Sequence, residues 1–133
     1  MKTSKGFTLV ELVIVIVIVG ILSIVAVPIY RGYTRKAMAS EGKALVGSVQ
    51  TSQKIYYAEY GMFYGMAANA SYDPVLDVDA RSNKYFTQFG VTGASTSQFT
   101  AQTIADPASG AKGITISLTG VAQGAVTTNE SGI

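Results

Sequence analysis

The sequence predicts an α+β fold, in which one long N-terminal helix packs under a small antiparallel β-meander of three to four strands. Three observations support this prediction. An apolar run fills the N-terminal quarter, an amphipathic helical pattern follows it directly, and short alternating segments separated by turns occupy the C-terminal half. At 133 residues, the chain has room for one small domain besides the apolar segment.

The apolar run extends from Leu12 to Tyr30 and contains no charge, with Ser23 as its one clearly polar residue. A helix rises about 1.5 Å per residue, so this run spans roughly 28 Å, close to the ~30 Å hydrocarbon thickness of a bilayer. We therefore predict one membrane-spanning helix with the carboxylate of Glu11 at its edge. A charge among apolar neighbours is costly unless it reaches the headgroup level or finds a partner.

A cleaved signal peptide is the main alternative for this segment. Lys2 and Lys5 fit its positive start, but the apolar run is too long, and no small-residue cleavage site follows Pro28. The helix is therefore expected to be retained. Pro28 removes one backbone hydrogen bond, so we expect a kink in the helix at this residue. Gly20 also weakens the helix.

Beyond residue 30 the pattern becomes amphipathic. Residues at helical spacing form one predicted buried face: Met38, Leu45, Val49, Ser52, Tyr56, Tyr60 and Phe63. Gly61 is a helix-stop signal. We expect one helix over residues 7–60.

The segment 61–83 is predicted to be an irregular connection. Its aspartates Asp73, Asp77 and Asp79 raise the alternative of a calcium site, but their spacing matches no full calcium loop, and a solvated loop is favoured.

Strands are predicted at residues 85–91, 98–104 and 113–119, with a weak fourth strand at 121–126. In the second and third strands, alternation points these residues inward: Phe99, Ala101, Thr103, Ile114, Ile116 and Leu118. The tail 127–133 is expected to be loosely held.

The sequence contains no histidine and no cysteine, which excludes sites and catalytic pairs built on those residues. It also carries no phosphate loop or dinucleotide fingerprint. We therefore expect no cofactor, no metal and no enzymatic activity.

The segment Lys5-Gly6-Phe7-Thr8-Leu9-Val10-Glu11-Leu12 resembles the leader-peptidase junction of type IV prepilins. The resemblance covers residues 2–33 and implies cleavage after Gly6 and N-methylation of Phe7, so that the chain is the substrate of an enzyme. It also implies that Glu11 meets the N-terminal amine of a neighbouring subunit. The segment between Gly20 and Pro28 is expected to lose helicity on filament assembly.

The resemblance implies a type IV pilin-like layout. Residues 1–6 form a leader, 7–30 a transmembrane and polymerisation half-helix, and 31–133 a head outside the cytoplasm. The head divides into an amphipathic half-helix at 31–60, a loop at 61–83, a sheet at 84–126 and a C-terminal tail. Loss of Lys2 and Lys5 with the leader leaves as many basic as acidic side chains, so charge gives no argument for nucleic-acid binding.

The function implied by the resemblance is that of a structural subunit of an extracellular type IV pilus, or fimbrium, supporting adhesion, twitching motility or DNA uptake. The expected partners are further copies of the chain, a prepilin peptidase, an inner-membrane assembly platform and, before assembly, membrane lipid. The precursor would reside in the inner membrane and the assembled subunit in the pilus at the cell surface.

Two alternatives remain open from the sequence. One is a minor pilin or pseudopilin of a type II secretion or competence machine, although no calcium-binding loop is evident around Asp106. The other is an electron-conducting filament, for which the aromatic residues are Phe7, Tyr30, Tyr33, Tyr56 and Tyr57. Aromatic residues at helical spacing are more often packing residues.

Overall fold

The computed structural model describes residues 6–122 and 126–133. Its secondary structure consists of one helix and seven strands: α1 (Leu9–Tyr60), β1 (Met66–Ala70), β2 (Tyr72–Asp73), β3 (Val78–Asp79), β4 (Phe89–Thr92), β5 (Gln98–Ile104), β6 (Thr115–Val121) and β7 (Thr127–Ser131). The chain divides into two units, residues 1–34 and residues 35–133, which we describe separately. Helix α1 contributes to both units.

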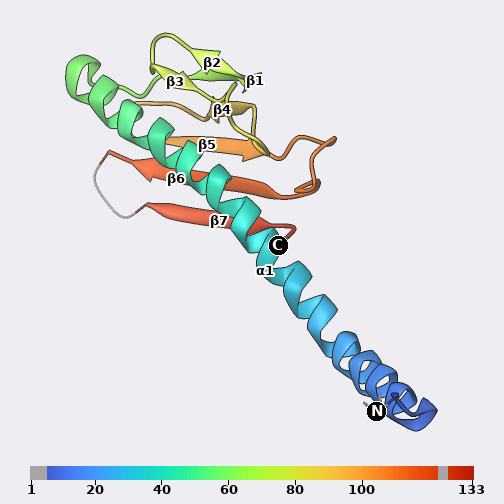
Figure 1. The fold of residues 1–133 in the computed structure, drawn as a ribbon. Coiled ribbons are helices and arrows are strands. Elements are labelled where there is room, and N and C mark those ends of the chain that lie inside the picture. Colours follow the sequence, from blue (N-terminus) through green and yellow to red (C-terminus); the bar gives the residue numbers. More distant parts are fainter. Residues whose placement is uncertain (1–5, 123–125) are drawn as a thin grey trace. The chain divides into compact units, whose positions relative to one another are not determined.

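In the unit of residues 35–133, hereafter the head, the last part of α1 lies against one face of an antiparallel sheet (Figure 1). The strand order is β1-β4-β5-β6-β7, and β2 and β3 form a separate hairpin. The predicted α+β class is thus confirmed. The main sheet has five strands, one more than the upper limit of the sequence prediction.

The central pair of strands, β5 and β6, forms the longest ladder, from Gln98 opposite Val121 to Ile104 opposite Thr115. All residues predicted to point inward from these two segments are buried: Phe99, Ala101, Thr103, Ile114, Ile116 and Leu118. Strand β6 begins two residues later than predicted, because Gly113 has a φ of 84°, outside the extended region.

The buried face of α1 is rotated relative to the predicted face. Leu45 and Val49 are buried as expected, but Tyr60 is exposed. The buried positions of the helix are Ala39, Gly42, Leu45, Val46, Val49 and Gln53. The difference arises because the buried face includes Gly42 and Gln53, two residues whose types do not indicate an apolar face.

Gly42 is the point where Phe86 packs most closely against the helix. A Cβ at position 42 would lie 2.9 Å from the Cζ and Cε1 atoms of Phe86, so a larger residue would displace the ring. The absence of a side chain at Gly42 therefore allows the Phe86 ring to pack against α1.

The segment 61–83, predicted as an irregular connection, contains β1 and the β2–β3 hairpin. The sequence of β1 has no alternating apolar pattern, which is why the strand was not predicted. It pairs with β4 through a register irregularity and leaves most of its side chains exposed. Asp73 Oδ1 accepts hydrogen bonds from the Val75 and Leu76 N–H groups at 2.9 Å and shapes the hairpin turn. The guanidinium of Arg81 donates two hydrogen bonds to Asp79 and holds the pKa of that carboxyl at about 2.

The tail, predicted to be loosely held, forms β7 at the sheet edge. Its residues are exposed, so apolar burial does not hold it in place. Lys43 Nζ lies 2.6 Å from Glu130 Oε1, and the Arg35 guanidinium donates to the carbonyl oxygens of Lys112 and Gly132. Polar contacts from α1 thus secure a strand that the sequence pattern does not reveal. Residues 123–125, part of the predicted weak fourth strand, lie outside the described residues.

Strand β4 begins at Phe89 rather than at residue 85 because the preceding backbone is bound by a side chain of α1. Glu41 Oε1 accepts hydrogen bonds from the N–H groups of Tyr85 and Phe86 at 2.6 and 2.9 Å. Its other oxygen accepts one from Lys84 at 3.1 Å. These donors are therefore not available to a neighbouring strand.

We expect Glu41→Ala to lower the free energy of unfolding by about 2–3 kcal/mol, because it removes a charged acceptor from three backbone donors. The measurement is denaturant unfolding of the full chain in uncharged detergent, followed by circular dichroism. Glu59→Ala is the matched control, since it removes a carboxylate from the same helix. Equal effects of both substitutions would contradict the role assigned to Glu41.

Candidate assembly site

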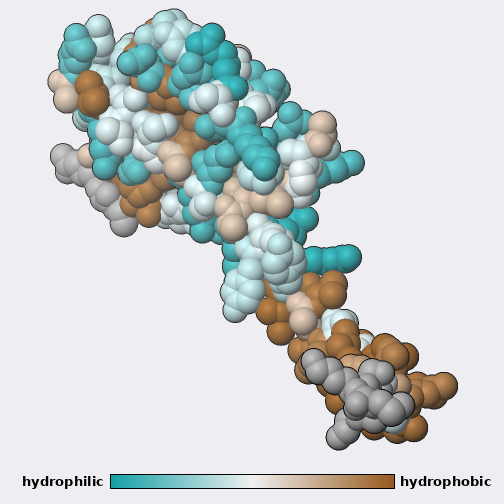
Figure 2. Space-filling view, viewed as in Figure 1, coloured by the Kyte–Doolittle hydropathy of each residue, from teal (hydrophilic) through white to brown (hydrophobic). Residues whose placement is uncertain are grey.

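The first unit presents an apolar helical surface. Every residue from Gly6 to Tyr33 is exposed, and Figure 2 shows apolar side chains gathered along this part of the chain. Among the described residues, α1 is the one helix long and apolar enough to cross a membrane. Soluble monomers rarely expose contiguous apolar patches above a few hundred Å². Such a surface is typical of a segment that lipid or other protein chains cover.

Thr8 and Glu11 form a capping box at the start of α1. The Thr8 N–H and hydroxyl groups donate to Glu11 Oε2 at 2.9 and 2.8 Å, and the Glu11 N–H donates to Thr8 Oγ1 at 3.3 Å. These contacts satisfy two backbone donors that the first helical turn would otherwise leave without partners. Thr8 is a site residue that our sequence analysis missed, although the pattern Thr-x-x-Glu before an apolar run is a recognised sequence signal.

The capping box uses only one of the two carboxylate oxygens of Glu11. Both contacts from Thr8 end on Oε2, and no described residue donates to Oε1. The side chain is thus held in a defined position with one oxygen open to a further donor. A carboxylate at this place also complements the positive end of the helix dipole.

Gly6 and Phe7 precede the helix and are both exposed. A Cβ added at Gly6 would meet no atom within 4 Å, so packing within the described chain does not require glycine there. The structure thus brings Thr8 and Glu11 together at the first turn, and leaves Gly6 and Phe7 in an exposed segment before it.

The helix assignment continues through Gly20 and Pro28. Because Pro28 has no N–H group, the carbonyl of Ile24 lacks its usual donor four residues later. Gly20 has open space around its Cα, so its lack of a side chain has no packing role within the described chain. The break between these positions was predicted for the assembled state, and it stays a prediction.

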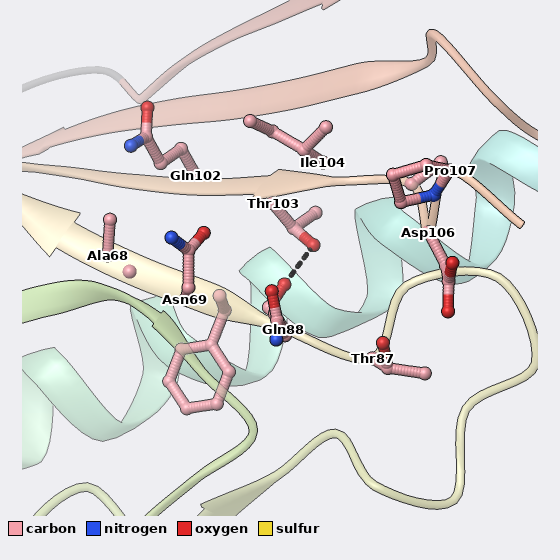
Figure 3. Close-up of a pocket in the computed structure, with 12 residues that line it drawn as sticks. Ala68, Asn69, Thr87, Gln88, Gln102, Thr103, Ile104, Asp106 and Pro107 are labelled. Carbon is pink, nitrogen blue, oxygen red and sulfur yellow. Dashed lines mark hydrogen bonds between the residues drawn. The ribbon is translucent and has the colours of Figure 1, made fainter.

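The head carries a cavity of about 270 Å³ with a mixed polar and apolar lining beside β4 and β5 (Figure 3). The side chains of Asn69, Gln88 and Gln102 line it, and the Thr103 hydroxyl donates to the Gln88 carbonyl oxygen. Asp106 is the one ionisable residue in its lining. Without a second ionisable group, this cavity offers no acid–base pair for catalysis.

Comparison with known proteins identifies related sequences. A family model described as the prokaryotic N-terminal methylation motif matches residues 1–27. The fimbrial protein EcpC of Eikenella corrodens is 34% identical over 123 residues, which cover 91% of this chain and 77% of that protein.

Two further relatives match over shorter regions. A fimbrial protein of Neisseria meningitidis serogroup B is 45% identical over 67 residues, covering 50% of this chain and 39% of that protein. The type IV major pilin protein PilE of Neisseria gonorrhoeae is 48% identical over 60 residues, covering 45% of this chain and 36% of that protein. The chain therefore matches less than half the length of these two relatives.

Proposed function

We propose that this chain, which belongs to the type IV pilin family, is a structural subunit of an extracellular pilus filament. The family is structural rather than enzymatic. The observation that carries the proposal is the wholly exposed apolar surface of residues 6–33, with the Thr8–Glu11 capping box at its start. Such a surface suits a subunit that moves from lipid into a protein filament.

The proposed subunit has three parts with separate roles. Residues 1–6 are a leader, removed by a prepilin peptidase, and residues 7–30 are the membrane and polymerisation helix. Residues 31–133, which include the head as defined above, lie outside the cytoplasm. Before assembly the helix lies in the inner membrane, where lipid covers its apolar side chains. An assembly platform then transfers it into a filament, where the same side chains pack against other copies of the chain.

Cleavage after Gly6 creates a positive amine on Phe7, which is N-methylated in the proposed pathway. The Phe7–Thr8 peptide bond is retained, so the Thr8 contacts to Glu11 Oε2 survive the cut. Glu11 Oε1 then accepts the Phe7 amine of a neighbouring subunit. Four residues of a helix rise about 6 Å, and Phe7 and Thr8 precede α1, so a neighbour displaced axially by roughly that distance or slightly more places its amine level with Glu11.

The helix between Gly20 and Pro28 is expected to lose its regular hydrogen bonding in the filament, because both residues weaken it. Proline costs a helix about 3 kcal/mol relative to alanine, so Pro28→Ala should retain helix through this segment. High-resolution maps of wild-type and Pro28→Ala filaments provide the comparison. Gly32→Ala is the control, since a Cβ there meets nothing within 4 Å. A continuous helix in the wild-type filament would refute the prediction.

The roles that we propose for the filament are adhesion, twitching motility or DNA uptake. The test of the structural assignment is the composition of sheared surface filaments, measured by quantitative mass spectrometry. If this chain is a main structural subunit, it will make up the bulk of the filament protein. Recovery at trace level would instead place it among the minor subunits, and its absence would overturn the proposal.

A further inference from the structure

A second cavity of the head lies where the end of α1 faces the turn between β2 and β3. Its volume is about 460 Å³, within the range of small-molecule sites. The residues that define this tyrosine cavity are Ile55, Tyr56, Glu59, Tyr60, Val75 and Asp77. They combine aromatic rings, aliphatic side chains and carboxylates in one lining.

The aromatic part is pre-arranged. Tyr56 and Tyr60, one helical turn apart, stack with ring centroids 4.4 Å apart and an interplanar angle of 29°. Tyr64 packs against Tyr56 from outside the helix, with centroids 5.4 Å apart. Tyr60 nevertheless remains 58% exposed. Ring faces attract cations because the π-system carries a negative quadrupole, and the electron-rich faces of tyrosine serve this purpose well.

The acidic part consists of Glu59 and Asp77. Neither carboxylate forms an ion pair with another described residue, whereas Asp79 pairs with Arg81 and Glu130 pairs with Lys43. The negative charge of Glu59 lies close enough to Tyr60 to raise the pKa of its phenol. Two carboxylates at an aromatic cavity give it a negative potential that lacks an internal counter-ion among the described residues.

The remaining lining residues are Ser52 and the aliphatic residues Ile55, Val75 and Leu76. Ile55 and Val75 are 65% and 50% exposed and offer aliphatic surface beside the tyrosine rings. A strongly hydrated metal ion does not suit such walls, and the described residues contain no group of three or more metal-ligating side chains. An organic cation with alkyl substituents matches this lining, because its charge suits the carboxylates and the tyrosine ring and its alkyl groups suit the aliphatic side chains.

We propose that the tyrosine cavity binds an alkylated ammonium ion, such as the trimethylammonium group of choline. The exposed ring of Tyr60 contacts the methyl groups and the charge, Tyr56 holds that ring in place by stacking, and Glu59 and Asp77 supply the negative charge. This inference concerns the head of a single chain and does not depend on filament assembly.

The test uses the full chain in uncharged maltoside micelles, with ¹³C-labelled tyrosine rings observed by NMR. Choline chloride is titrated against sodium chloride at equal ionic strength and against 3,3-dimethyl-1-butanol, its neutral carbon isostere. We expect saturable shifts of the Tyr56 and Tyr60 rings with choline, and at least about tenfold weaker binding of the isostere. Equal affinity for both probes, or equal shifts with sodium chloride, would overturn the proposal.

Substitutions in the lining test whether choline binds in the tyrosine cavity. Tyr60→Leu and the double variant Glu59→Gln with Asp77→Asn are each expected to weaken choline binding about tenfold or more. Tyr33→Leu is the matched control, because it removes an exposed tyrosine that does not line the cavity. Wild-type affinity in the double variant would contradict the assignment.

A further titration distinguishes between two sources of the ammonium group, lipid headgroups and free amines. Binding of glycerophosphocholine within about threefold of choline would assign lipid headgroups as ligands. Binding of choline but not of the phosphodiester would assign free amines, since the phosphate adds a negative charge near Glu59 and Asp77. Failure of both probes to bind would overturn the proposal.

Discussion

Glu11→Val is expected to give a protein that is processed and inserted normally but does not polymerise. In the proposed filament the apolar helices leave lipid and pack together, so the Phe7 amine of each subunit would enter a nearly water-free core without a partner. Removing one partner of a buried ion pair typically costs about 3–5 kcal/mol. The measurement compares the membrane pool with the sheared-filament fraction. Normal filament yield would show that the carboxylate does not set the register.

The structure supplies a sharper variant for the same question. Glu11 also caps the helix through Thr8, so loss of assembly in Glu11→Val has two possible causes. Glu11→Gln retains a capping-box acceptor at this position but removes the charge. If the amine is the partner, Glu11→Gln should fail to assemble while Glu11→Asp, with a shorter reach, remains partly competent. Filaments from Glu11→Gln in wild-type amounts would assign the capping role alone.

Thr8→Val completes the comparison, because it removes the threonine hydroxyl from the cap and leaves the charge of Glu11 in place. We expect reduced but measurable filament yield. N-cap substitutions cost about 1 kcal/mol, which is less than the loss of a buried charge partner.

Gly6→Val is expected to leave uncleaved precursor in the membrane and to abolish filaments. The glycine allows the backbone to lie close to a narrow peptidase site, whereas a β-branched side chain adds bulk at the cut. Since a Cβ at Gly6 meets nothing within 4 Å, the substitution should leave folding unchanged. The readouts are the mass of the membrane-bound chain and the first residue of filament subunits.

Gly47→Ala is the matched control for this experiment, because position 47 is likewise free of close contacts. It should be processed and assembled as the wild type is. Wild-type filaments should begin with methylated Phe7. A filament subunit that begins at Met1, or normal processing of Gly6→Val, would contradict the cleavage prediction.

The N-terminal features were evident in the sequence because each depends on local chemistry. An uncharged run has a length that can be compared directly with a bilayer, and Gly6, Phe7 and Glu11 belong to a contiguous motif. The strand β5 was likewise predicted at its observed bounds, since its alternation reports a sheet with one buried face.

The tertiary structure decided which side of α1 is buried and where the peripheral strands lie. Gly42 and Gln53 are buried because Phe86 packs on the first and the backbone of Tyr64 hydrogen-bonds to the second. Neither position is part of a periodic pattern of apolar residues in the sequence. Both residues depend on partners outside α1, and the periodicity of the helix carries no information about such partners.

Strand β7 illustrates the same limit at the sheet edge. Its exposed polar residues carry no alternation, and the strand exists because β6 offers an open ladder and because Arg35 and Lys43 hold its end. The sequence by itself therefore determined the long apolar helix, the N-terminal methylation motif and the α+β class, all of which depend on local composition and periodicity. The three-dimensional structure alone decided the helix rotation, the edge strands and the two cavities, because backbone pairing and side-chain contacts between distant segments create them.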